Sequence, residues 1–326
     1  MASSVISRSC LVKGAMLSFL CCLLLFPSSA LSGAKKGLLL WFNQVLPSLL
    51  PFLILSTLFL STGLSDSIAK HLAPVLSPIF RCSPSGCYAI VIGLLAGLPV
   101  GAKTIASLVA SGKITKKEGE YLLPLCNNPS PLFLLGFLSV SVLNRPDLRY
   151  PVLLIVTLSS VLAAMLLRPC TDASCAQTPL SPAFPQKSAH SVTPPTPTFS
   201  FSFLLLDAAI EQAFSVLTRV GGYIILFSVL ANLLTLLPLP ASFLACIGAL
   251  LEITTGSAAL AELPLSSDFL ISIITGFVTF GGLSTAAQTK SVLAGTGFPF
   301  AHYLLTKALA GIIAGLLMTG YLHILA

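Results

Sequence analysis

The sequence GLPVGAK at residues 97–103 interrupts a hydrophobic segment that is long enough to cross a membrane. Three further apolar segments are interrupted in the same way, by NNPSP at 127–131, EITTGS at 252–257 and GGLSTAAQ at 281–288. Backbone N–H and C=O groups cannot stay unpaired in lipid, so broken helices occur only inside protein or around a water-filled cavity. Two interruptions lie in each half of the chain, and this pattern is typical of a transporter with its substrate site near the middle of the bilayer.

The composition indicates the class of protein. Hydrophobic residues make up 55% of the 326 residues and charged residues only 8%, against about 25% charged residues in a soluble domain. A soluble core of this size could not bury so much apolar surface, whereas a lipid bilayer covers it directly. We therefore expect an all-α, polytopic helical membrane protein with two repeated halves that contain broken or re-entrant helices.

Several other classes of protein are disfavoured. The net charge of +7 comes from small basic clusters between apolar segments, without the long basic run that would suggest nucleic-acid binding. No two of the nine cysteines have C-x-x-C spacing, and no histidines stand near enough to complete a metal site. The G-x-S-x-G, H-E-x-x-H and P-loop motifs are absent. We expect no nucleic-acid partner, no metal, no cofactor and no enzymatic activity.

The order of features divides the chain into four regions. We expect an N-terminal helix at 1–36, a first membrane repeat at 37–167, a Pro/Ser/Thr-rich extramembrane linker at 168–205 and a second membrane repeat at 206–326. The N-terminal helix is either an uncleaved anchor, which we favour, or a signal peptide. Basic clusters lie in too many successive loops to fix the orientation, and the sequence does not decide whether the broken segments span or re-enter.

Lys103 follows the first interruption, deep within an apolar segment. An ammonium group inside a membrane is costly, so it is a functional candidate by default. A half-helix that begins near Gly101 would point its N–H groups and positive dipole end at the same place, which suits a carboxylate. The structural alternative is that Lys103 reaches an interface or pairs with Glu252.

Asn127, Asn128 and Ser130 form the densest polar cluster in the membrane region. The prolines at 129 and 131 lack N–H groups and free upstream carbonyls. Two carboxamides and a hydroxyl can pair with those carbonyls or hydrogen-bond a solute. We favour a substrate-binding role for them, with a helix cap as the alternative.

Glu252 and Thr255 stand at the third interruption. A buried carboxylate in a transporter can carry a proton, bind a cation or neutralise a basic side chain. Arg219 and Lys103 are the candidate partners. We predict coupling or counter-ion roles for Glu252 and Arg219, and we add Thr255 to the substrate-binding set.

Ser284 and Gln288 lie in the fourth interruption and are four residues apart, so they share one face of a helix. We predict that both contact the substrate. The alternative is close helix packing by the small residues around them. Lys290 and Lys307 are interpreted as more exposed, interfacial residues.

Four patterns together resemble a known family: WFxxVxPSLLPF at 41–52, GxPVGAK at 97–103, CNNxSPxF at 126–133 and GGxSxxxQ at 281–288. In this order they resemble the sporulation integral membrane proteins of the nucleoside-recognition (Gate) group, dipicolinate-transport type, from about residue 37 onward. The resemblance implies endospore formation, a place in the mother-cell membrane that becomes the outer forespore membrane, and transport of dipicolinic acid. The Gate description also suggests nucleosides.

Three functions remain open from the sequence. The first is a dipicolinate transporter whose partners are a small-molecule anion and the lipid bilayer. The second is a nucleoside transporter, and the third is a non-transporting membrane scaffold for spore assembly. A homo-oligomer is compatible with any of them, because membrane bundles often dimerise, but no segment identifies an interface.

Overall fold

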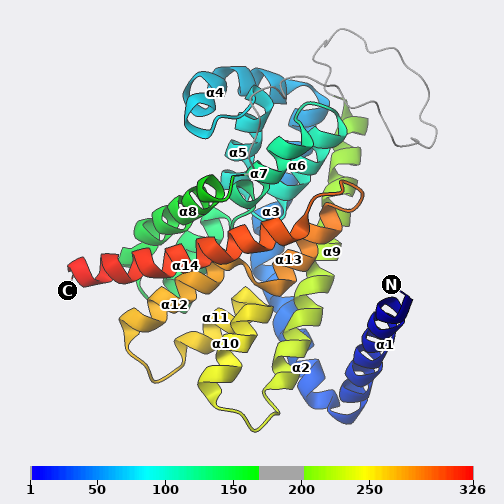
Figure 1. Ribbon diagram of the computed structural model, residues 1–326, viewed down its shortest axis with the longest axis vertical. Coiled ribbons are helices and arrows are strands. Elements are labelled where there is room, and N and C mark those ends of the chain that lie inside the picture. The colour runs from blue at the N-terminus through cyan, green and yellow to red at the C-terminus, as the bar shows by residue number, and fades with distance from the viewer. Residues whose placement is uncertain (1, 169–201, 326) are drawn as a thin grey trace.

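Every element in the described part of the chain is helical (Figure 1). The structure is a computed structural model that describes residues 2–168 and 202–325. The α-helices are α1 (Ala2–Leu25), α2 (Pro27–Leu40), α3 (Leu46–Ser61), α4 (Leu64–Phe80), α5 (Pro84–Ala96), α6 (Val100–Ala110), α7 (Lys116–Cys126), α8 (Arg149–Leu166), α9 (Phe203–Leu234), α10 (Ala241–Leu251), α11 (Ile253–Ala261), α12 (Ser267–Phe280), α13 (Gly282–Val292) and α14 (Phe300–Leu325). Three shorter segments are the π-helices η1 (Trp41–Val45) and η2 (Phe133–Val142) and the 3-10 helix η3 (Pro146–Leu148). The all-α prediction is confirmed.

The helices are long and apolar enough for several membrane crossings. Four qualify by length and composition, at Pro146–Leu166, Phe203–Leu234, Ser267–Val292 and Phe300–Ile324. Two bent pairs in the described residues, α1 with α2 and α3 with α4, also qualify when each pair is counted as one span. Large apolar side chains stay exposed on these helices, as expected for surfaces that face lipid. The chain is a polytopic membrane protein.

The two halves of the fold contain the same order of helices. The first half has α3, an α5–α6 hairpin, α7 broken from η2, and the uninterrupted α8. The second half has α9, an α10–α11 hairpin, α12 broken from α13, and the uninterrupted α14. The two hairpins enter from opposite ends of the molecule, and their tips approach its middle (Figure 1). This arrangement is the one expected of an inverted repeat.

The first and third interruptions are re-entrant hairpins. Gly256 packs on Gly248, so α11 folds back along α10. Gly93 and Gly101, on either side of the first interruption, both lie against Cys126 at the end of α7. Both ends of each hairpin therefore lie on the same side of the molecule.

The fourth interruption is a break within a spanning helix. The helices α12 and α13 together form one candidate span. Between them Gly281 adopts a φ of +96°, a backbone conformation that glycine takes without the steric penalty of a side chain. The protein thus combines re-entrant and spanning broken helices.

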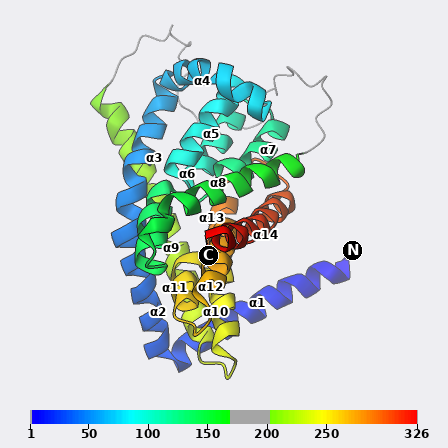
Figure 2. The same ribbon diagram turned by 90° about the vertical axis from the view of Figure 1, so that its left-hand side faces the viewer.

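A long bent rod of α2, η1 and α3 runs beside α9 (Figure 2). The Trp41 indole Nε1–H donates to the Leu217 carbonyl at 2.9 Å, which ties the rod to α9. The predicted boundary at residues 36/37 falls inside α2. Of the predicted linker at 168–205, residues 169–201 lie outside the described residues, and 203–205 begin α9. The division into four regions stays a prediction.

We predict that Gly101→Ala lowers the free energy of unfolding in detergent by about 1–3 kcal/mol, because the site is already fully packed. A Cβ at Gly101 would lie 2.7 Å from the Cys126 carbonyl carbon, and that backbone atom cannot move away cheaply. Chemical denaturation of the purified variant measures the loss. The matched control is Gly222→Ala, since a Cβ at this helical glycine meets no atom within 4 Å. An equal effect in both variants would contradict the packing argument.

Candidate functional site

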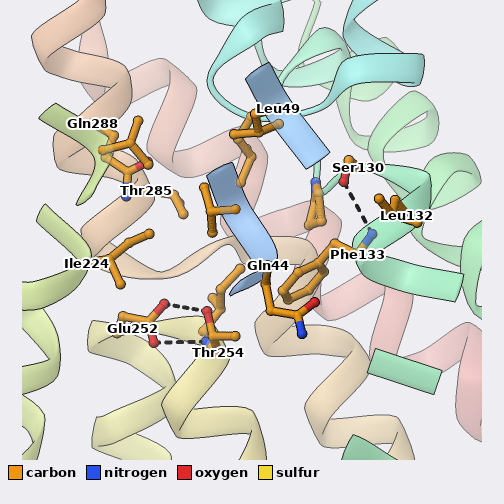
Figure 3. Close-up of a pocket in the computed structure, with 15 residues that line it drawn as sticks. Gln44, Leu49, Ser130, Leu132, Phe133, Ile224, Glu252, Thr254, Thr285 and Gln288 are labelled. Carbon is orange, nitrogen blue, oxygen red and sulfur yellow. Dashed lines mark hydrogen bonds between the residues drawn. The ribbon is translucent and has the colours of Figure 1, made fainter. Parts of the chain in front are cut away.

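All four interrupted segments line one pocket (Figure 3). Leu98 comes from the first, Ser130 from the second, Glu252 from the third, and Thr285 from the fourth. The complete lining is Gln44, Val45, Leu49, Leu98, Pro129, Ser130, Leu132, Phe133, Val220, Ile224, Glu252, Ile253, Thr254, Thr285 and Gln288. This central pocket has a cavity volume of about 80 Å³.

The lining of the central pocket mixes apolar and hydrogen-bonding groups. Its polar side chains are Gln44, Ser130, Glu252, Thr254, Thr285 and Gln288. Figure 3 shows Thr285 and Gln288 across the pocket from Ser130 and Phe133. Glu252 is the one charged side chain among the described residues that line it. Such a wall can orient a small polar solute through a few hydrogen bonds.

Backbone hydrogen bonding joins the first and second interruptions. The Leu98 N–H donates to the Asn128 carbonyl at 2.8 Å. The Ser130 hydroxyl accepts from the Phe133 N–H at 3.3 Å, at the start of η2. Polar backbone groups that helix breaks would leave unpaired are therefore satisfied beside the pocket.

Glu252 caps α11. Its carboxylate accepts from the N–H and the hydroxyl of both Thr254 and Thr255, at 2.7–3.1 Å, and it is 2% exposed. A carboxylate at a helix N-terminus is stabilised by the N–H groups and the positive dipole end. Among the described residues Glu252 forms no ion pair. Arg219 is exposed beside Ser215, so the expected pairing of Glu252 with Lys103 or Arg219 is replaced by the cap.

Asn127 joins the second interruption to the other half of the protein. Its Nδ2 donates to Thr289 Oγ1 at 2.8 Å and to the Tyr303 hydroxyl at 2.9 Å. Its Oδ1 is buried with no hydrogen-bond partner in the described structure. Asn127 lies behind the wall of the central pocket rather than in it.

Asn128 accepts a hydrogen bond from a buried lysine. Lys307 Nζ donates to Asn128 Oδ1 at 2.7 Å, and the Ser160 hydroxyl donates to the same oxygen at 2.7 Å. Lys307 is 1% exposed, so its interpretation as an interfacial residue was wrong. Lys290 is exposed, as expected. Lys307 is buried because α14 packs against α7 and α8, which brings it to Asn128.

Ser284 and Gln288 share one face of α13, as their spacing predicted. Gln288 Nε2 donates to Ser284 Oγ at 3.2 Å. Gln288 lines the central pocket, whereas Ser284 is buried behind it.

Lys103 and Gly101 lie away from the central pocket. Lys103 lines a second pocket between α3, α6 and α9, with its Nζ 3.4 Å from Thr57 Oγ1. Gly101 is buried against Cys126. The structure thus brings Ser130, Glu252 and Gln288 together and holds the remaining predicted residues behind the pocket or apart from it.

Four polar residues near the site were not predicted as site residues: Gln44, Thr254, Thr285 and Lys307. Gln44 could have been identified from the sequence as a candidate, since it and Asn43 form a pair of adjacent amides inside an apolar segment. Lys307 could also have been identified from the sequence, because a lysine within a long apolar helix is a functional candidate by default.

The fold and the pocket define a multi-pass helical membrane protein with paired broken helices. Residues 42–171 match the family model described as nucleoside recognition (Gate). The chain is 27% identical over 311 residues to the "Sporulation integral membrane protein YlbJ" of Bacillus subtilis (strain 168). This alignment covers 88% of the chain and 76% of that relative. The chain is therefore similar to the Gate family model over part of its first half, and to a sporulation integral membrane protein over most of its length. No solved structure matches it.

We predict that Asn128→Leu lowers the free energy of unfolding by about 3 kcal/mol, because it leaves the buried Lys307 ammonium without its acceptor. Adding Lys307→Met should recover at least about 1 kcal/mol of that loss, since the ammonium is then gone. Denaturation of both variants in detergent measures the coupling. The control Lys70→Met, at an exposed lysine of α4, should change stability by less than about 0.5 kcal/mol. Additive losses in the double variant would contradict the contact.

Proposed function

We propose that this protein transports a small polar solute across the membrane and that the central pocket holds the solute. The observation that supports this most directly is that all four interrupted segments line that one pocket. Helix interruptions at membrane depth are tolerated where they surround a cavity, and paired interruptions in two halves typically form a transporter's binding site.

The solute proposed first is a small organic anion, dipicolinate. Lys103 and Lys307 lie at least partly buried within the helical core, and neither pairs with a carboxylate in the described structure. The buried Glu252 carboxylate is held by its own helix. The two lysines lie outside the central pocket, where a positive charge would attract an anion toward the core. The similarity to a sporulation integral membrane protein supports a role in sporulation, and the family resemblance of the sequence motifs supports the outer forespore membrane as the place.

The residues divide into three proposed roles. Ser130, Thr285 and Gln288 hydrogen-bond the solute from facing walls. Asn127 and Asn128 position the second interruption by bonding to α13 and α14. Glu252, inside the pocket, couples transport to a proton or another ion.

A nucleoside is the second candidate solute. With the exception of Glu252, the polar side chains of the central pocket are uncharged amides and hydroxyls. Such groups can donate to and accept from a base and a ribose. The family description, nucleoside recognition, agrees with this chemistry.

We predict that purified protein in proteoliposomes takes up labelled dipicolinate with saturation, and that Gln288→Leu lowers the rate about tenfold or more. The variant removes a hydrogen bond to a charged solute, worth about 1.5–3 kcal/mol. The exposed-site variant Lys290→Met serves as the control. Competition by uridine and not by dipicolinate would favour the nucleoside. Absence of uptake of either solute by folded protein would instead support a membrane scaffold.

We also predict that Glu252→Gln retains uptake but loses its response to a proton gradient. Glutamine keeps an acceptor for Thr254 and Thr255 and removes the titratable charge. Initial rates with and without an imposed gradient provide the measurement. Glu262→Gln, at an exposed residue at the other end of α11, is the matched control. A gradient response that survives in Glu252→Gln would exclude this carboxylate as the coupling group.

A further inference from the structure

A second pocket lies between α3, α6 and α9, on the same α3–α9 interface as the central pocket. Six hydroxyl side chains line it, from Ser56, Thr57, Ser61, Thr104, Ser107 and Ser111. The cations in its lining are Lys103 and Lys113, and Gln212 of α9 completes the polar wall. We call this the outer pocket.

The outer pocket carries one uncompensated positive charge. Lys113 is paired with Asp66 at 2.6 Å. Lys103 has no carboxylate within ion-pair distance among the described residues, and its Nζ lies 3.4 Å from Thr57 Oγ1. A partly buried ammonium is stabilised by a counter-anion. The Thr57, Ser61 and Ser111 hydroxyls donate to backbone carbonyls, so they act as acceptors toward the pocket.

An apolar layer separates the outer pocket from the central pocket. On α3, Leu49 lines the central pocket and Leu53, one turn further on, lines the outer pocket. On α9, Val220 lines the central pocket and Gln212 the outer one, eight residues and about 12 Å away along the helix. Leu53 and Leu217 are both 0% exposed and belong to the same packed cluster. The two pockets thus lie in series along the α3–α9 interface, and by their positions on these helices Leu53 and Leu217 lie between them; we call these two residues the leucine layer.

We propose that the outer pocket is a second anion-binding site, which takes a small organic carboxylate at Lys103 on one side of the leucine layer. A carboxylate oxygen accepts from the ammonium, and whichever hydroxyl of the Ser56–Thr104 pair does not donate to the other can donate to a remaining lone pair. The identity of the carboxylate, dipicolinate, rests on the proposed function. The site itself rests on the charge and lining of the outer pocket.

The test places a thiol in the outer pocket. Ser107 lines the pocket one helical turn after Lys103, so Ser107→Cys in the full chain reports on the local potential. Anionic and cationic methanethiosulfonates are each allowed to react with the detergent-solubilised protein. Each reaction rate is divided by the rate of the same reagent with a free thiol in solution. Peptide mass spectrometry separates the introduced thiol from the nine native cysteines. We expect the anionic reagent to react on the order of tenfold faster, and millimolar dipicolinate to protect the thiol.

Variants at Lys103 decide the assignment. Lys103→Gln, added to Ser107→Cys, should remove both the preference for the anionic reagent and the protection, while Lys103→Arg should keep both. Gln288→Leu, in the central pocket, should leave the protection unchanged. Equal normalised rates, or protection that survives in Lys103→Gln, would overturn the outer site.

The two proposals fail in distinguishable ways. Protection of the thiol by dipicolinate in a protein that shows no uptake would support the outer site and contradict transport. Uptake that persists in Lys103→Gln, with no protection in the parent, would contradict the outer site and leave transport standing.

Discussion

A backbone that leaves its helix inside a membrane must find new hydrogen-bond partners, and this constraint organises the whole protein. The N–H of Leu98 in the first break is paired with the carbonyl of Asn128 in the second. The third break is satisfied by the Glu252 cap, and the fourth by the Thr285 hydroxyl, which donates to the Gly281 carbonyl. The polar groups that pair with the broken backbone therefore lie close together, and they contribute to the wall of the central pocket.

Charge is distributed unevenly around this centre. The carboxylate of Glu252 lies in the wall of the central pocket, whereas the ammonium groups of Lys103 and Lys307 lie outside that wall. Lys307 takes part in packing the two halves together, and Lys103 faces a cavity of its own. An anion that moved along the α3–α9 interface would meet the outer pocket with Lys103 and the central pocket with Glu252 in turn, with leucines between them.

The sequence was informative where structure depends on local chemistry. Glycine, proline and polar residues within apolar segments predicted all four breaks, and the spacing of Ser284 and Gln288 predicted their shared face. Grouping the side chains required tertiary packing. Lys103 looked like part of the same site as Ser130, but α6 directs it to another pocket. Lys307 and Asn128 are 179 residues apart, and nothing local to either indicates the bond between them.

That long-range bond has a consequence for biosynthesis. Lys307 and Tyr303 leave the ribosome well after Asn127 and Asn128, and 179 residues separate Lys307 from Asn128. At about 5–20 residues per second this interval lasts roughly 10–35 s. During that time Asn127 lacks the Thr289 and Tyr303 hydroxyls to which its amide later donates, and an unpaired amide in hydrocarbon is costly. The nascent first half must therefore stay hydrated or be shielded by the insertion machinery until α14 arrives to complete it.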